Sequence, residues 1–162
     1  MATSSEFPCA HTASRQIEAS PDRIYQAFVE PENLRQWLAP EGATCEIRHF
    51  DPREGGRFEF VLTFGAEIGK SSLRSDVVKG LFERLSPSRL IVQAVEFVSD
   101  RPEFAGTMRM SWVLSASPPG TRVKVVAEDV PSGIDRTDHE VGMRSTLENL
   151  ARFVEQAKMR TP

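Results

Sequence analysis

The chain has 162 residues, of which 40% are hydrophobic and 27% are charged, and its formal net charge is −3. This length suits a single domain, and the composition is that of a globular protein and excludes wholesale disorder. The interleaved, slightly acidic charge lacks the basic stripe that nucleic-acid binding requires, so no nucleic-acid partner is expected. No run approaches the roughly 18 apolar residues of a membrane span, and no signal peptide is evident.

The cysteines and histidines predict neither a disulfide framework nor a metal centre. Cys9 and Cys45 are too few for a disulfide scaffold and belong to no Cys-x-x-Cys motif. His11, His49 and His139 are widely separated and lack the spacing of metal ligands. We therefore expect a reduced, cytoplasmic protein without metal or cofactor.

The N-terminal part is predicted to hold a tail, a strand and two short helices. Residues 1–11 show no periodicity and indicate a loose tail, whereas residues 12–19 alternate as in a strand. Ser20 is a good helix N-cap, and Pro21 suits the first position of the helix. A second short helix is predicted over residues 32–38.

The middle of the chain switches to a period of two. Residues 57–64 give the clearest pattern, because Phe58 and Phe60 share one face with the later apolar residues of the segment. Gly55-Gly56 precedes this segment as a turn. Residues 65–75 are polar and predicted to be a loop. The strands are expected over residues 44–50, 57–64, 76–85, 89–98, 107–116 and 121–130.

The C-terminal segment is predicted to be one long amphipathic helix over residues 135–159. Its apolar stripe, at spacings of three and four, consists of Met143, Leu147, Leu150 and Val154. Strands in one consecutive block lack the helical crossovers of a parallel sheet, so the sheet must be antiparallel. The predicted fold is therefore α+β, with residues 12–162 forming one domain.

The dimensions of the two layers predict a curved sheet. A helix is only about 10 Å wide. A sheet of six or seven strands is about 30 Å across at the usual spacing between strands. The sheet must therefore curl round the helix, and the remaining gap must be filled by large side chains, by the two short helices or by a ligand. An aromatic stripe is more often plain core than a binding site, and this alternative stays open.

Several weak motifs resemble, in their order and spacing, one known family. The matching residues are Ala19-Ser20-Pro21-Asp22, Ile24, Ala27, Phe28, Pro31-Glu32, Leu34, Trp37, Gly55-Gly56, Phe58, Gly80, Glu83, Pro87, Arg89, Leu90, Gly120-Thr121-Arg122-Val123, His139, Gly142, Leu147 and Leu150. With these residues the chain is similar to the START-like (SRPBCC, helix-grip) superfamily, in the AHSA-type branch related to the C-terminal domain of the activator of the ninety-kilodalton heat-shock-protein ATPase. The similarity covers about residues 13–157 and departs from the common pattern at Met143 and Leu38.

The resemblance implies a helix-grip fold with an internal hydrophobic cavity. Family members use such a cavity to bind lipids, sterols, hormones or polyketides, and a minority catalyse cyclisation or dehydration. We therefore predict that the protein binds a small hydrophobic molecule. The alternatives are a cyclase- or dehydratase-like enzyme and a protein-interaction module such as an ATPase activator with a chaperone partner. A homodimer is compatible with each of them.

The predicted ligand-binding residues act through shape and dispersion contact, not through chemistry. Glu96 and His139 are the possible polar groups of the pocket. The inward face of residues 89–98 is left open, because the two phases are equally apolar. One phase holds Leu90, Val92 and Ala94 with Glu96, and the other holds Ile91, Val95 and Phe97 with Gln93. The predicted apolar residues are Trp37, Phe58, Phe60, Phe82, Met110, Trp112, Met143 and Leu147.

Overall fold

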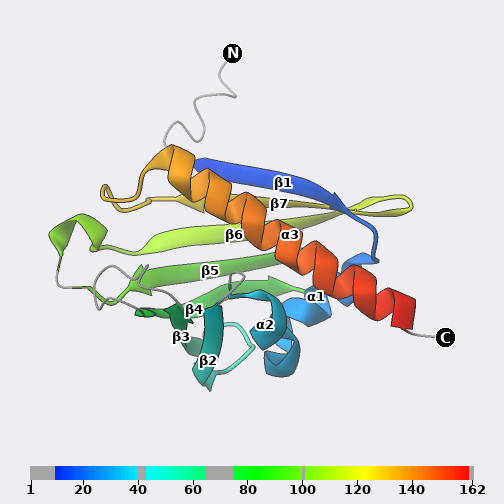
Figure 1. Ribbon diagram of the computed structural model, residues 1–162, viewed down its shortest axis with the longest axis horizontal. Helices are drawn as coiled ribbons and strands as arrows, with labels where there is room; N and C mark the ends of the chain where they lie inside the picture. The colour runs from blue at the N-terminus through cyan, green and yellow to red at the C-terminus, as the bar shows by residue number, and fades with distance from the viewer. Residues whose placement is uncertain (1–9, 40–42, 65–74, 100, 161–162) are drawn as a thin grey trace, which may run out of the picture.

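The computed structural model describes residues 10–39, 43–64, 75–99 and 101–160. Within these ranges, three helices and seven strands form an α+β domain (Figure 1). The elements are β1 His11–Ile17, α1 Pro21–Val29, α2 Pro31–Trp37, β2 Ala43–Phe50, β3 Arg57–Phe64, β4 Ser75–Ser86, β5 Leu90–Phe97, the 3₁₀ turn η2 Pro102–Phe104, β6 Met108–Ser117, β7 Gly120–Glu128 and α3 Arg136–Arg160.

The seven strands form one antiparallel sheet in the order β1-β7-β6-β5-β4-β3-β2. The strands from β2 to β7 follow each other as a meander, and β1 joins the free edge of β7. The register shifts between Ile47 and His49 on β2 and between Phe82 and Arg84 on β4. Such irregularities bend a strand and increase its twist, which helps the sheet to curve. The predicted antiparallel meander is confirmed.

The helices begin where the capping residues predict. Ser20 precedes α1, and its Oγ accepts a hydrogen bond from the backbone N–H of Arg23 at 3.2 Å. Pro21 occupies the first helical position, where its missing N–H costs nothing. Asp135 precedes α3, and its carboxylate accepts from the N–H of Asp138 at 3.0 Å. Both ends therefore satisfy amides that a helix N-terminus leaves free.

The long helix lies diagonally across one face of the sheet (Figure 1). Its backbone approaches β1 most closely, and its other close neighbours are α1 and α2. The apolar stripe faces inward, since Met143, Leu147, Leu150 and Val154 are all buried. The concave side of the sheet, α3 and the two short helices therefore enclose one core, as predicted.

Most boundaries differ from the prediction by one or two residues, among them the start of β1 and the start of β4. The first strand begins at His11, and Ala10 and His11 are buried, so the expected tail extends two residues too far into the domain. Sequence periodicity misses this because a histidine on an edge strand breaks the apolar pattern. The loop expected over 65–75 lies almost wholly outside the described residues, and β4 begins at Ser75.

Candidate functional site

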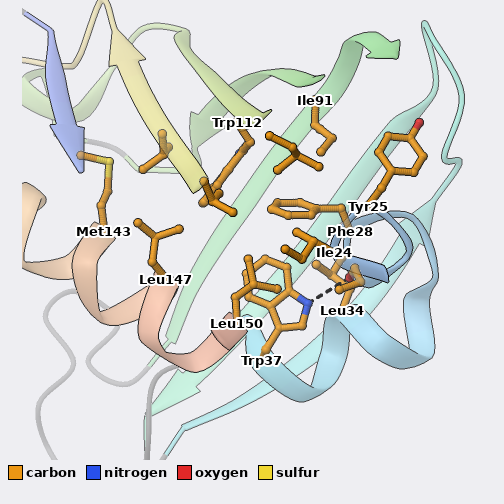
Figure 2. Close-up of a cluster of buried hydrophobic side chains, with 14 of the residues drawn as sticks. Ile24, Tyr25, Phe28, Leu34, Trp37, Ile91, Trp112, Met143, Leu147 and Leu150 are labelled. Carbon is orange, nitrogen blue, oxygen red and sulfur yellow. Dashed lines mark hydrogen bonds between the residues drawn. The ribbon is translucent and has the colours of Figure 1, made fainter. Parts of the chain in front are cut away.

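The predicted apolar residues come together in the core between the sheet and the helices. Trp37, Phe58, Phe60, Phe82, Trp112, Met143 and Leu147 are buried, and Met110 is partly buried against them. Figure 2 shows side chains from α1, α2, α3 and the sheet converging on the region around Trp112. The structure thus brings all eight residues into one apolar cluster, although they come from five separate elements.

One part of this cluster is an aromatic contact between the sheet and the short helices. The Phe28 ring lies 4.9 Å from Trp37 and 5.0 Å from Trp112, measured between ring centroids. The indole N–H of Trp37 donates to the backbone oxygen of Ala27 at 2.9 Å, so the buried polar atom is satisfied (Figure 2). These contacts fix the end of the core at which α1 and α2 lie.

A second aromatic group covers the inner face of β3 and β4. The rings of Phe58 and Phe60 are stacked at 4.9 Å with an interplanar angle of 12°, and Phe82 lies 5.2 Å from Phe58. Gly80 makes this arrangement possible, because a Cβ there would lie 2.6 Å from Cζ of Phe58 and would also meet the backbone oxygen of Ala94. The absence of a side chain therefore lets the Phe58 ring rest on the sheet.

The two halves of the concave face are not covered equally. On β7, beneath α3, the inward residues Val123, Val125 and Ala127 have no exposed surface. Towards the β2 edge, Phe58, Phe60 and Phe82 are buried, but other inward apolar residues that pack against the core stay only partly buried. They are Ile47, Leu62, Val78 and Phe97, together with Met110 on β6. Apolar surface therefore remains accessible on the half of the sheet that lies away from the closest approach of α3.

The structure settles which face of β5 points inward. Ile91 and Val95 are buried in the core, and Gln93 shares their face. Glu96 belongs to the opposite face and its side chain is exposed. The suggestion that Glu96 is a polar pocket group is therefore wrong. The polar side chain on the inward face of β5 is Gln93, a member of the other phase.

Gln93 has direct cross-strand partners that are apolar. Its neighbours are Phe82 on β4 and Met110 on β6. The indole N–H of Trp112 donates to Gln93 Oε1 at 3.0 Å. Within β5 and β6, Gln93 is the only polar residue at an inward position.

His139, the other predicted polar group, pairs with His11 at the junction of α3 and β1. Their Nδ1 atoms lie 2.8 Å apart, so one ring donates to the other. Nearby, the Glu140 carboxylate accepts from the backbone N–H of Thr12 at 2.9 Å and lies 3.5 Å from the guanidinium of Arg136. Sequence spacing could not reveal this pair, because its members are 128 positions apart.

Both imidazoles favour their neutral form. Burial lowers the pKa of His11, and the Arg136 cation lowers it further, against smaller opposing effects of Glu140 and Asp135. Burial also lowers the pKa of His139, with a further contribution from His11. A neutral pair can share one Nδ1–H, whereas protonating both rings would place two cations side by side. The pair is therefore a polar contact that joins the first strand to the terminal helix.

A separate open groove of about 440 Å³ lies on the outside, between α1 and the C-terminal part of α3. Most of its wall is polar, including Asp22, Arg23 and Glu30, and none of the predicted ligand-binding residues lines it.

In the described part of the chain, no three His, Cys, Asp or Glu side chains are grouped as metal ligands would be. The helices described there are also too short or too polar to cross a membrane.

Comparison with solved structures gives the same architecture. A protein of Chromobacterium violaceum is 28% identical with a TM-score of 0.81, and the match covers 92% of this chain and 99% of that one. An AHSA1-like protein of Aeromonas hydrophila is 19% identical with a TM-score of 0.72, covering 94% and 96% of the two chains. A protein of Nitrosomonas europaea is 19% identical with a TM-score of 0.69, covering 93% and 96%.

The family comparison agrees with these structural similarities. No curated protein matches the chain. The family model described as "Activator of Hsp90 ATPase homolog 1-like protein" matches residues 18–155, from the end of β1 to the last turns of α3. Because this match spans most of the chain, the protein belongs to the family of activator of Hsp90 ATPase homolog 1-like proteins, the AHSA branch of the START-like superfamily.

Proposed function

We propose that the protein binds a small hydrophobic molecule between the concave face of the sheet and α3. The observation that carries this proposal is the uneven cover of the inner face. Apolar side chains such as Val78, Phe97 and Met110 point inward yet remain partly accessible. Apolar surface of this kind is stabilised when it leaves water, at about 25 cal/mol for each Å². A guest molecule would supply that burial.

The family and the chemistry of the wall support binding without catalysis. The START-like fold is often a ligand-binding fold. A cyclase or dehydratase would need at least two polar groups that converge on the substrate. Within β5 and β6 only Gln93 is polar and inward, and the His11–His139 pair belongs to the junction of β1 and α3. Asp76 shares the inward phase of β4, but it lies six positions from Phe82, the partner of Gln93, which is about 20 Å along a strand, so the two polar groups do not converge. This composition favours a binding chamber over an active site.

The alternative of a protein-interaction module receives less support from the surface. Such a module needs a contiguous apolar patch on its exterior. Among the described residues, only Val98 and Val141 are large hydrophobic side chains that are strongly exposed. Two single residues do not amount to a patch, and isolated exposed hydrophobics are normal.

A size substitution on the inner face tests the proposal. Val78→Phe would extend into the proposed chamber, whereas Lys79→Phe places the same ring on the exposed face of the same strand. If the space beside Val78 is empty, the larger ring fits there, and the free energy of unfolding of Val78→Phe stays within about 0.5 kcal/mol of that of the original protein. It also weakens binding of the neutral dye Nile red at least tenfold, while Lys79→Phe does not.

The opposite result has a clear meaning. A filled core would make Val78→Phe an overpacked variant that loses about 1–3 kcal/mol, and Nile red would then bind neither protein specifically. Native mass spectrometry of the purified protein provides a second measurement. An apolar molecule that co-purifies with the original protein and is lost from Val78→Phe supports the proposal.

A further inference from the structure

Gln93 is a polar side chain set into an apolar wall. On its own strand the inward neighbours are Ile91 and Val95, both buried, and on the adjacent strands they are Phe82 and Met110. None of these four side chains can donate a hydrogen bond, and only the thioether of Met110 is a weak acceptor, to which no hydrogen bond of Gln93 is formed. Any polar requirement of Gln93 must therefore be met by Trp112, by water or by a ligand.

The contact with Trp112 fixes the orientation of the amide. An indole N–H is a donor only, so the atom it meets at 3.0 Å must be the carbonyl oxygen of Gln93. The amide nitrogen, with its two hydrogens, then points away from the indole. Gln93 is thereby held in one orientation by a partner that is itself buried.

The amide nitrogen is left without a protein partner. No acceptor for Nε2 occurs among the described residues, where the single side-chain hydrogen bond of Gln93 is the one to Trp112. Every fully buried side-chain nitrogen or oxygen in that part of the chain does have a partner. The Nε2 of Gln93 must therefore keep surface that water can reach.

We propose that Gln93 determines the specificity of this chamber by donating a hydrogen bond from Nε2 to an uncharged carbonyl oxygen of the ligand. This inference rests on the proposed function, since the same space holds the ligand. A pure hydrocarbon that displaced the water from Nε2 would leave a donor unsatisfied, which carries a penalty. No inward side chain of β5 or β6 is cationic, so a neutral acceptor suits the wall better than a carboxylate. The ligand class is a hydrophobic ketone, ester or amide.

A purely structural role for Gln93 makes a different prediction. Satisfying the indole of Trp112 requires only the oxygen of the amide and leaves Nε2 without a function. Under that explanation, removal of the amide changes stability but does not change the discrimination between ligands. The test must therefore compare ligands that differ only in the carbonyl group.

Matched pairs of probes make this comparison. Acetophenone with cumene and acetylnaphthalene with isopropylnaphthalene are pairs of similar shape in which one member carries a carbonyl group. Their affinities are measured by calorimetry for the original protein, for Gln93→Met and for the control Glu96→Gln on the exposed face of β5. The ratio of ketone to hydrocarbon affinity should fall about 2- to 12-fold in Gln93→Met and stay unchanged in Glu96→Gln.

Nuclear magnetic resonance of the original protein gives a readout that does not depend on the variant folding. The side-chain NH₂ signal of Gln93 should shift when a ketone is added and move less with its hydrocarbon counterpart. The role of Gln93 is refuted if the ratio of ketone to hydrocarbon affinity is the same in Gln93→Met as in the original protein and both ligands shift the NH₂ signal equally. The proposed function stands in that case, because both members of the pair bind. If no member of either pair binds, both proposals are contradicted.

Discussion

Replacing a glycine by alanine should have opposite effects at two positions of this chain. Gly80 lies on β4 beneath the ring of Phe58, and a Cβ there meets the backbone oxygen of Ala94 as well as Cζ of Phe58 at 2.6 Å. The carbonyl belongs to the paired strand β5 and cannot move without disturbing the sheet. Gly142 lies on the exposed side of α3, and a Cβ there meets nothing within 4 Å.

The magnitudes follow from these surroundings. Overpacking costs about 1–3 kcal/mol, and Gly80→Ala belongs at the upper end because one of the obstacles is backbone. A loss of about 3 kcal/mol lowers the Tm of a domain of this size by about 6–12 °C. In Gly142→Ala the substitution removes the penalty of glycine in a helix, about 0.8–1 kcal/mol, so Tm should rise by about 2–4 °C.

Urea unfolding measured by tryptophan fluorescence provides the assay, since Trp37 and Trp112 are both buried. Gly80→Ala should also weaken Nile red binding, because the displaced Phe58 ring moves into the proposed chamber. A Gly80→Ala protein as stable as the original would show that Phe58 does not rest on β4. A destabilised Gly142→Ala protein would show that this side of α3 is covered.

Three further outcomes are expected. Leu147→Ala, at a position with no exposed surface, should lose about 2–5 kcal/mol in urea unfolding. Val141→Ala on the same helix is exposed and should stay within about 0.5 kcal/mol; equal losses would contradict the assigned inner face. Because the pKa of His139 lies below its ordinary value of 6.5, the unfolded chain binds more protons and stability should fall as pH drops below 6.5. His139→Asn should flatten this decline, whereas the same change at exposed His49 should not; an unaltered slope in His139→Asn would refute the assignment. Burial raises the pKa of the Cys45 thiol, so in a Cys9→Ser protein this thiol should react with a disulfide reagent slowly until urea unfolds the protein. Fast reaction of the native Cys9→Ser protein would show that Cys45 is accessible.

Local chemistry accounts for the parts of the fold that the sequence predicted well. Ser20 and Pro21 define the start of a helix through capping and a fixed φ, both of which act within a few residues. The alternation of Phe58 and Phe60 identifies the buried face of β3 because side chains of a strand point to opposite sides in turn. The consecutive strands required an antiparallel sheet, and the apolar stripe of α3 predicted what the helix buries.

The parts that failed are those in which the local pattern is ambiguous. Both phases of β5 are apolar, so the sequence alone does not show whether Glu96 or Gln93 points inward. The pairing of β5 with β4 and β6 places Gln93 on the inner face. The sequence pattern places His11 in the tail, because a single histidine gives no periodic signal. Its partner His139 lies at the other end of the chain, and only the closure of β1 onto α3 brings the two rings together.

The amino-acid order by itself determined the elements, their sequence along the chain and which side chains are apolar, since these depend on interactions between near neighbours. Tertiary structure alone decided how far α3 covers the concave face and which polar groups lie against it. The orientation of the Gln93 amide depends on an indole from the next strand, and the exposure of Val78 and Met110 depends on the distance of the helix from β4 and β6. Such properties arise from the packing of surfaces against each other, which no short stretch of sequence encodes.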